Sequence, residues 1–349
     1  MVVRGWGGTV ATAAGVGVAV GAAQLGLGYG LDIIHWTHGR SDPSIGTTNL
    51  SWAVWIAANS VILGAVIAHR LGVDPANTGQ PETTDRLTRW LWRPVLGLAA
   101  GLGGSITVLL VMLPARTADL PQVSGSLAAT AAGYTAAGVV TGVVLAVAAL
   151  AARPVATNLL ATTGWVWLLG VAAVTTQVVG GADPTRIPLG FWETTAEGPW
   201  FRTVLLSDAA LPLAAVLVTG ALAAVPAARR RDHPVGVVLS GGAGPLVLTV
   251  AYLVAQPDLT SAAAMDLSRR LLLPYLVLVG VLGALVTSLV RPRPTPPAAK
   301  PAPAAPEEQT PDEGAAESAS PAEPTDPELD SATDASSPQT TVPPPRTGN

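Results

Sequence analysis

The sequence contains no cysteine, and only 12% of its 349 residues are charged. The absence of cysteine excludes disulfides, thiolate metal sites and cysteine nucleophiles. Soluble globular proteins carry about 25% charged residues, whereas this chain is 49% hydrophobic and has half of that charge. We therefore expect it to lie in lipid.

The sequence also lacks several common enzyme motifs. The sequence has no GxxxxGK[ST] loop, no HExxH and no GxSxG, which excludes a fused P-loop ATPase and the usual metalloprotease and hydrolase signatures. The net charge of −4 comes from residues 291–349, which hold ten acids and four bases. Residues 1–290 have a balance of +2. The acidic total therefore gives no indication of a nucleic-acid partner.

Long apolar runs dominate the rest of the chain. A membrane-spanning helix needs about 20 mostly apolar residues. Eight windows meet this length: Trp6–Gly30, Leu50–Ala68, Val95–Leu113, Leu127–Ala151, Asn158–Gly180, Thr203–Pro226, Val235–Ala255 and Leu271–Val290. The runs are too continuous for the short alternating strands of a membrane barrel. The sequence predicts an all-α, polytopic transmembrane helical bundle of about eight spans over residues 1–290.

The placement of arginine predicts the orientation. With the N-terminus inside, eleven arginines fall on the cytoplasmic side and six on the outer side. Both termini are then cytoplasmic, in a multi-pass protein of the cell membrane made of four hairpins inserted in the same sense. No residue-level internal repeat is evident. Arg4 also fits the start of a cleaved signal peptide, but the 27 uncharged residues after it favour a retained span.

The C-terminal segment changes composition after Arg291. Fifteen of residues 291–349 are proline, none is aromatic, and the segment is rich in alanine and acids. Such a chain buries too little apolar surface to fold. We predict a disordered Pro/Ala-rich acidic cytoplasmic tail, which either docks a cytoplasmic partner through its proline-rich start or serves as a spacer.

Few polar residues lie within the predicted spans. Asn59 is near the middle of the second span, where a hydrogen bond to another helix is favoured over a substrate contact. Asp208 is the single charged residue inside a window, either buried below the headgroups or acting as the N-cap of a span that begins after it. Gln177, near the outer end of the fifth span, is placed to reach toward Asp208.

The seventh span is interrupted by Gly241 and Pro245. Proline lacks the N–H that would bond the carbonyl of Gly241, so we predict a kink or a local unwinding. Broken helices form the ion and substrate sites of secondary transporters, and they also occur as inert kinks. This interruption, together with Asp208, Gln177 and Asn59, is the candidate transport or polar site.

Three arginines precede the third span on one helical face: Arg86, Arg89 and Arg93. With Trp90 and Trp92 beside them, they predict a short amphipathic helix on anionic lipid headgroups. A specific lipid or partner site is the sharper alternative.

The outer loops carry the remaining chemical groups. On a helix His35 and His38 would share a face and could share a metal, but an interfacial loop is the favoured interpretation. Glu193 and Glu197 are four residues apart and would share a helical face. They are either a pair of carboxylates that act as general acid and base, or part of an ordinary solvated face. The aromatic residues of segment 181–208 are expected to rest on the membrane surface. No catalytic, metal or cofactor set is predicted.

Two residue patterns predict how the helices lie. Trp52 and Trp55 fit an outer aromatic belt. Three GxxxG pairs allow close helix approach, either inside the bundle or in a homo-oligomer; they are Gly17/Gly21, Gly97/Gly101 and Gly138/Gly142.

Three features of the sequence carry a resemblance to a known group of proteins. The features are the start GWGGTV…AAQLGLGYG, the Ala/Val helices that end in arginine, and the Pro/acidic tail. Over residues 1–290 the chain resembles the uncharacterised multi-pass integral membrane proteins of actinobacteria. That resemblance implies no activity.

Three functional hypotheses follow. The first is a non-enzymatic accessory or scaffold protein of the cell envelope, with the lipid bilayer and a membrane protein or second copy as partners. The second is a permease or transporter subunit that uses the Asp208 region and the Gly241–Pro245 break. The third is a membrane enzyme that acts on a lipid-linked substrate through Glu193, Glu197 or Asp32.

Overall fold

The computed structural model describes residues 6–36, 43–72, 82–117, 126–181, 187–192, 210–230, 233–255 and 264–290. These residues contain helices and no β-strand. The helices are α1 (Trp6–Gly30), α2 (Pro43–Leu71), α3 (Glu82–Gly104), α4 (Ile106–Ala115), α5 (Leu127–Ala151), α6 (Arg153–Val179), α7 (Ala210–Arg230), α8 (Pro234–Ser240), α9 (Ala243–Ala255) and α10 (Ala264–Leu289). All belong to one compact unit, Met1–Arg293. The predicted tail lies outside the described residues, so its disorder stays a prediction.

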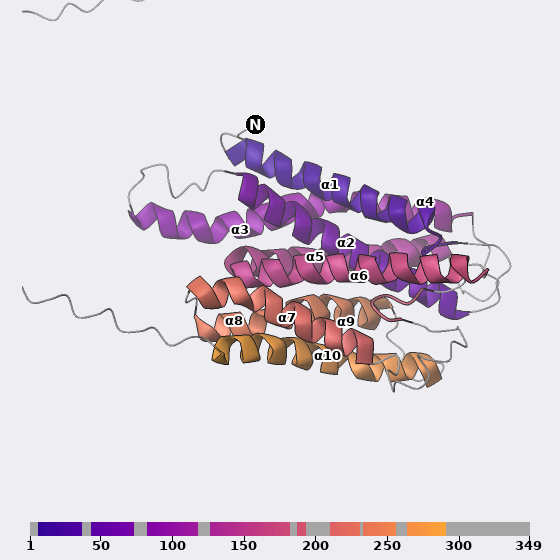
Figure 1. Ribbon diagram of the computed structural model, residues 1–349. Helices are drawn as coiled ribbons and strands as arrows, with labels where there is room; N and C mark the ends of the chain where they lie inside the picture. The colour runs from indigo at the N-terminus through magenta and orange to yellow at the C-terminus, as the bar shows by residue number, and fades with distance from the viewer. Residues whose placement is uncertain are drawn as a thin grey trace, which may run out of the picture. The chain divides into compact units, whose positions relative to one another are not determined.

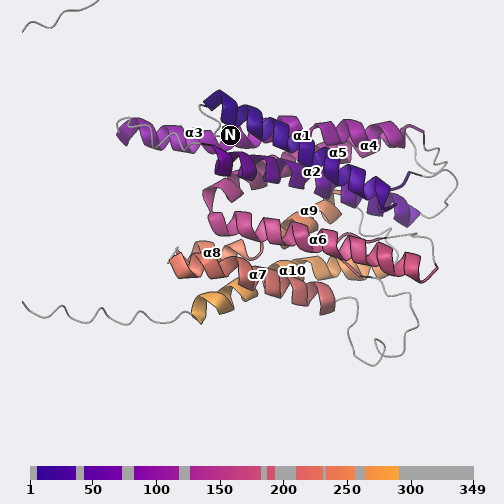
Figure 2. The ribbon, with the colours of Figure 1, turned by 45° about the horizontal axis from the view of Figure 1, so that its top comes forward.

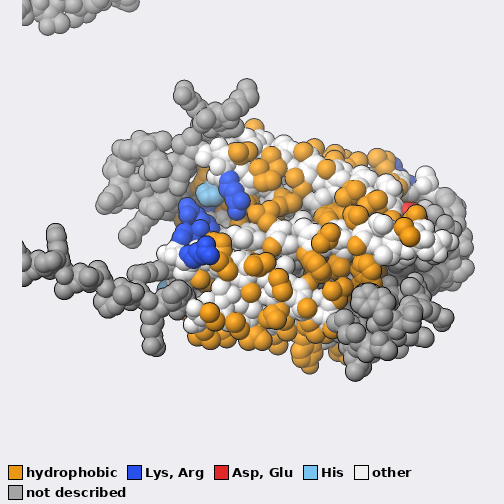
Figure 3. Space-filling view, viewed as in Figure 1, with side chains coloured by type: hydrophobic (Ala, Val, Ile, Leu, Met, Phe, Trp, Pro, Cys, Tyr) orange, Lys and Arg blue, Asp and Glu red, His pale blue; other side chains and the backbone are white. Residues whose placement is uncertain are grey.

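The helices have the length and composition of membrane spans. Within the described residues, seven candidate spans are long and apolar enough to cross a membrane, with Trp90–Ala115 counted as one. Helices α8 and α9, bent by 43° at their break, make an eighth if they are taken as one span. Hydrophobic side chains are spread along the face of the bundle that Figure 3 shows. The predicted all-α membrane bundle is confirmed.

Arginine side chains gather at one end of the bundle, as Figure 3 shows. We call this the arginine end; among the side chains that the structure describes it holds Arg70, Arg93, Arg153, Arg229 and Arg230. The other end, where α1 finishes and α2 begins, is called the loop end and holds Arg116 and Arg270. This excess of arginine at one end agrees with the uneven placement of arginine in the sequence.

The bundle consists of two halves of four spans each. The first contains α1, α2, the α3–α4 pair and α5; the second contains α6, α7, the α8–α9 pair and α10. Figures 1 and 2 show the halves as two layers. In both halves the second span packs on the fourth, and the third packs on the first and the fourth. The third span is interrupted in both, at Ser105 and at Gly241–Gly242. The sequence analysis missed this repeat.

Glycines bring the helices into close contact inside each half. A Cβ at Gly17 would lie 2.7 Å from the Ala100 carbonyl oxygen, and one at Gly142 would lie 2.7 Å from that of Ala58. In the second half, a Cβ at Gly283 would overlap the Leu217 carbonyl oxygen. The glycine pairs therefore serve packing within the bundle, which is one of the two roles that the sequence left open.

We predicted a separate surface helix before the third span, and this prediction is wrong. Helix α3 begins at Glu82 and continues through Pro94 to Gly104. Proline is tolerated inside a membrane helix because neighbouring helices satisfy the freed backbone groups. Arg86 and Arg89 lie on the first turns of α3, with side chains outside the described residues, and Arg93 is half-buried. Their contact with lipid headgroups stays a prediction.

Candidate functional site

The two halves meet where α2 and α5 of the first contact α6 and α9 of the second. Helix α6 places two polar residues on the buried face that meets α9 of its own half. Asn158 and Thr162 are four residues apart, which puts them on one side of a helix, and they are 0% and 3% exposed. Pro154 occupies the first turn of α6, where its missing N–H does no harm.

Asn158 caps the broken span from another helix. Its Oδ1 accepts a hydrogen bond of 2.7 Å from the backbone N–H of Gly244. Because α9 begins at Ala243, this N–H belongs to the first turn, where no partner exists within the helix. Pro245 comes next and has no N–H to satisfy. Asn158 thus does the work of an N-cap residue, although it stands 86 positions away in sequence.

The predicted break in the seventh span is confirmed, with a refinement of its position. Helix α8 ends at Ser240 and α9 starts at Ala243, so the interruption lies at Gly241 and Gly242. Pro245 is inside the first turn of α9 and not at the bend itself. A Cβ at Gly241 would overlap the Gly280 carbonyl oxygen of α10, so the close approach of α8 to α10 requires glycine here.

Two buried polar atoms beside this cap have no hydrogen-bond partner in the described structure. They are Nδ2 of Asn158 and Oγ1 of Thr162. Both side chains lie against Gly244, where a Cβ would overlap Thr162 Oγ1 and lie 2.9 Å from Asn158 Oδ1. A buried polar group without a partner costs about 1–3 kcal/mol. Such groups therefore mark a position where a further hydrogen-bonding partner would be stabilising.

Asn59 forms the helix–helix hydrogen bond that the sequence favoured. Its Oδ1 lies 2.9 Å from Oγ1 of Thr163, which joins α2 of the first half to α6 of the second. Thr163 Oγ1 also lies 2.8 Å from the Leu159 carbonyl oxygen. Because a hydroxyl has one proton, it can donate to only one of these acceptors at a time. The contact is a structural link across the interface.

A non-helical segment, residues 187–192, fills the same interface at the loop end. Ile187, Leu189 and Phe191 are each no more than 2% exposed. The segment is tied at two carbonyls: Trp52 Nε1 donates to that of Ile187 and the Tyr252 hydroxyl to that of Leu189, both at 2.8 Å. The prediction that this part of the outer loop rests on the membrane surface is wrong for Phe191, whose ring packs edge-on against Tyr252.

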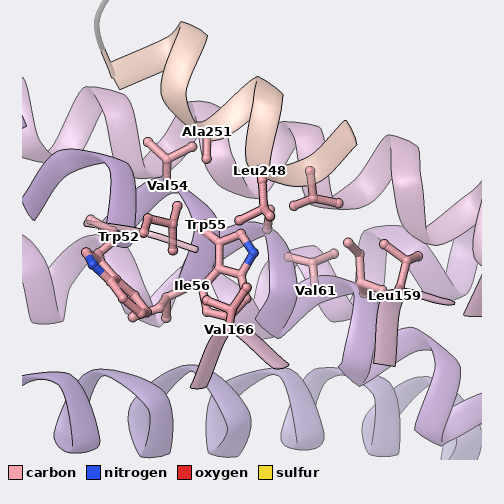
Figure 4. Packing of buried hydrophobic residues seen from close by; sticks show 14 of the residues in the cluster. Trp52, Val54, Trp55, Ile56, Val61, Leu159, Val166, Leu248 and Ala251 are labelled. Atoms are coloured by element: carbon pink, nitrogen blue, oxygen red, sulfur yellow. The ribbon is translucent and has the colours of Figure 1, made fainter. Parts of the chain in front are cut away.

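The predicted aromatic belt is also wrong for Trp52 and Trp55. They are 0% and 1% exposed, and with Trp167 they form a cluster whose ring centroids are 5.4–6.2 Å apart. Figure 4 shows Trp52 and Trp55 among the core residues, with Val166 and Leu248 close by. Helix α2 lies between the other helices, so all its sides are buried, and tryptophan there contributes packing area.

The remaining sequence candidates do not come together in one site. Asp208, His38, Glu193 and Glu197 lie outside the described residues. Gln177 lies on α6, about 28 Å along the helix from Asn158 at 1.5 Å per residue, and its Oε1 is buried without a hydrogen-bond partner.

The loop-end histidine has partners from its own turn. His35 Nδ1 lies 3.1 Å from the Asp32 carbonyl oxygen and 3.7 Å from the Asp32 carboxylate. Asp32 has a positive φ of 54°, a conformation that aspartate tolerates better than most residues. The described part of the chain contains no group of three or more His, Cys, Asp or Glu able to hold a metal ion.

Sequence reasoning missed Asn158 and Thr162. The available signal was a pair of polar residues four apart inside an apolar run. What the sequence did not show is that both breaks occur in the third span of a half.

The chain was compared with known proteins. No protein-family model, no curated protein and no solved structure matches it.

Proposed function

We propose that this chain is a transport protein of the cell membrane, which moves a small solute along the interface between its two four-span halves. The observation that supports it best is the break at Gly241–Gly242, whose second piece begins at the buried Asn158–Thr162 pair. Interrupted spans in corresponding positions of two halves are the best structural pointer to a transporter's binding site. Here both interruptions fall in the third span of a half.

The proposal includes an orientation, with the arginine end in the cytoplasm. Five arginines with described side chains lie there, against two at the loop end. The native chain has no cysteine, so single cysteines report topology cleanly. In intact cells an impermeant maleimide should label Asp32→Cys, at the loop end, and leave His233→Cys, at the arginine end, unlabelled. The reverse labelling would refute the orientation.

Transport itself is tested in vesicles. The full chain is reconstituted, and the entry of acetamide, acetate and sodium is measured against protein-free vesicles of the same lipid. Entry of at least one solute above the protein-free rate is expected, and it should fall several-fold in Asn158→Leu. If all three solutes enter at the protein-free rate, the proposed function is wrong for these classes of small solute.

An accessory or scaffold role is the second candidate. It is favoured by the nature of the interface, where Asn59 and Thr163 bond each other and the buried groups near Asn158 carry no charge. This role predicts a stable membrane-protein partner that co-purifies in mild detergent, and loss of a tail partner when residues 295–349 are deleted. A chain that purifies alone before and after the deletion counts against it. The enzyme hypothesis gains no support, because Glu193 and Glu197 lie outside the described residues and Asp32 lies beside His35 of its own turn.

A further inference from the structure

We propose that the Asn158–Thr162 pair at the start of α9 binds an uncharged solute through a hydrogen-bond acceptor atom, such as a carbonyl oxygen. The proposal rests on the proposed transport function and names the class of solute. It stands on the buried start of α9, which is a 13-residue helix, and on two polar side chains beside it whose hydrogen-bonding capacity is unused.

The role of Asn158 follows from its existing bond. The Gly244 backbone N–H can only donate, so the atom of the Asn158 amide that faces it at 2.7 Å must be the oxygen. The amide orientation is therefore determined by chemistry, although the two ends of an amide look alike. The other end is the NH₂ group, which is a pure donor. A ligand atom that satisfies Nδ2 must be an acceptor.

Thr162 supports the same class of ligand atom. Its hydroxyl lies one helical turn after Asn158 on the same buried face, and it has no partner in the described structure. A hydroxyl can turn its proton toward an acceptor that is already held by the neighbouring amide. A Cβ at Gly244 would overlap Thr162 Oγ1, so the glycine is what lets this hydroxyl lie directly against the start of α9.

The surroundings favour a solute without net charge. Asn158, Thr162 and Gly244 are uncharged, and a buried anion without a cationic partner costs several kcal/mol. The start of α9 carries only about half a positive charge, and Asn158 Oδ1 already bonds one of its N–H groups. A cation is disfavoured as well, because Nδ2 and the helix start both present positive charge. A neutral carbonyl or hydroxyl compound matches these groups best.

Binding is measured on the purified full-length chain in detergent, independently of transport. The unfolding temperature is followed while acetamide, sodium acetate or sodium chloride is added, because a ligand of the folded state raises it with concentration. Acetamide and acetate have the same shape and differ in charge. Acetamide should raise the unfolding temperature, whereas acetate should do no more than chloride.

A matched pair of variants localises the effect. Thr162→Val keeps the shape and removes the hydroxyl, so half-saturation should require about fivefold more acetamide, the effect of one lost hydrogen bond. Thr175→Val makes the same change on an exposed part of α6, where the hydroxyl donates to the Val171 carbonyl, and should leave binding unchanged. Asn158→Leu also uncaps α9, so Thr162→Val is the deciding variant.

The outcomes separate the two proposals. An acetate shift as large as that of acetamide, no acetamide shift in the wild type, or an unchanged shift in Thr162→Val would overturn the assignment of this site. Solute entry into vesicles that persists unchanged in Thr162→Val would overturn the site while leaving transport in place. Specific acetamide binding without entry of any solute would leave the site in place and refute transport.

Discussion

In the first half of the bundle the third span is interrupted for one residue, Ser105, whereas in the second half α8 and α9 are separated by two glycines and bent by 43°. Both halves use the same packing order of spans. Ser105 satisfies its own break, because its N–H donates to the Gly101 carbonyl and its hydroxyl to that of Leu102. The second break needs Asn158 from another helix.

The difference shows how one architecture acquires an inert kink in one half and a polar position in the other. Beside the first break, a Cβ at Gly103 would overlap the Ala14 carbonyl oxygen, so backbone lies directly on backbone. Beside the second break the neighbour is an amide and a hydroxyl with unused capacity. Both breaks are tightly packed, since a Cβ at Gly241 would overlap the Gly280 carbonyl oxygen, and the second break also meets hydrogen-bonding groups.

The largest expected effect tests whether the halves are packed alike. Gly138→Val and Gly283→Val introduce a side chain where a Cβ would overlap the carbonyls of Val54 and Leu217, in the contact of the fourth span with the second. Each should lower the free energy of unfolding in detergent by about 3 kcal/mol. Gly133→Val, on α5 with open space around it, is the control. A harmless Gly283→Val would contradict the repeat in packing.

The next prediction compares the two breaks. Asn158→Leu removes the cap of α9 and leaves the Gly244 N–H buried, so we expect a loss of about 2 kcal/mol in unfolding free energy. Ser105→Ala removes an exposed hydroxyl bonded within its own turn and should change stability by less than about 0.5 kcal/mol. Chemical denaturation of both variants measures this difference. Equal losses would mean that the breaks are held in the same way.

A third prediction concerns the segment 187–192, which lies between α6 and α7 of the second half. Tyr252→Phe removes the hydroxyl that donates to the Leu189 carbonyl, at a cost of about 1 kcal/mol. Amide hydrogen exchange should rise in a peptide that covers residues 187–192. Tyr134→Phe, on α5 of the first half, should leave that peptide unchanged. Unaltered exchange in Tyr252→Phe would show that the segment is held by packing alone.

The smallest expected effect lies at the link between the halves. Thr163→Val removes the partner of Asn59, and hydrogen bonds between membrane helices contribute about 0.6 kcal/mol on average. A double-mutant cycle with Asn59→Leu should give a coupling of that size. A coupling of zero would mean that Thr163 bonds the Leu159 carbonyl and that the halves are joined by apolar packing.

Much of the fold could be predicted because hydropathy sets it. The bounds of α1 and α5 coincide with the apolar windows Trp6–Gly30 and Leu127–Ala151. The errors at the aromatic residues share one cause. Trp52, Trp55 and Phe191 suit either a membrane interface or a protein core, and a single sequence does not show which of two apolar environments surrounds a side chain. Only the position of α2 between other helices decided it.

The sequence by itself determined that this chain is helical and apolar enough for a membrane, and that its seventh span breaks. These properties depend on composition and on neighbouring residues, which act locally on the backbone. The tertiary structure alone decided that the chain forms two matching halves and that Asn158 meets Gly244. An orphan N–H at a helix start can donate to any nearby acceptor. Only the three-dimensional packing of α6 against α9 selects the residue that accepts its hydrogen bond.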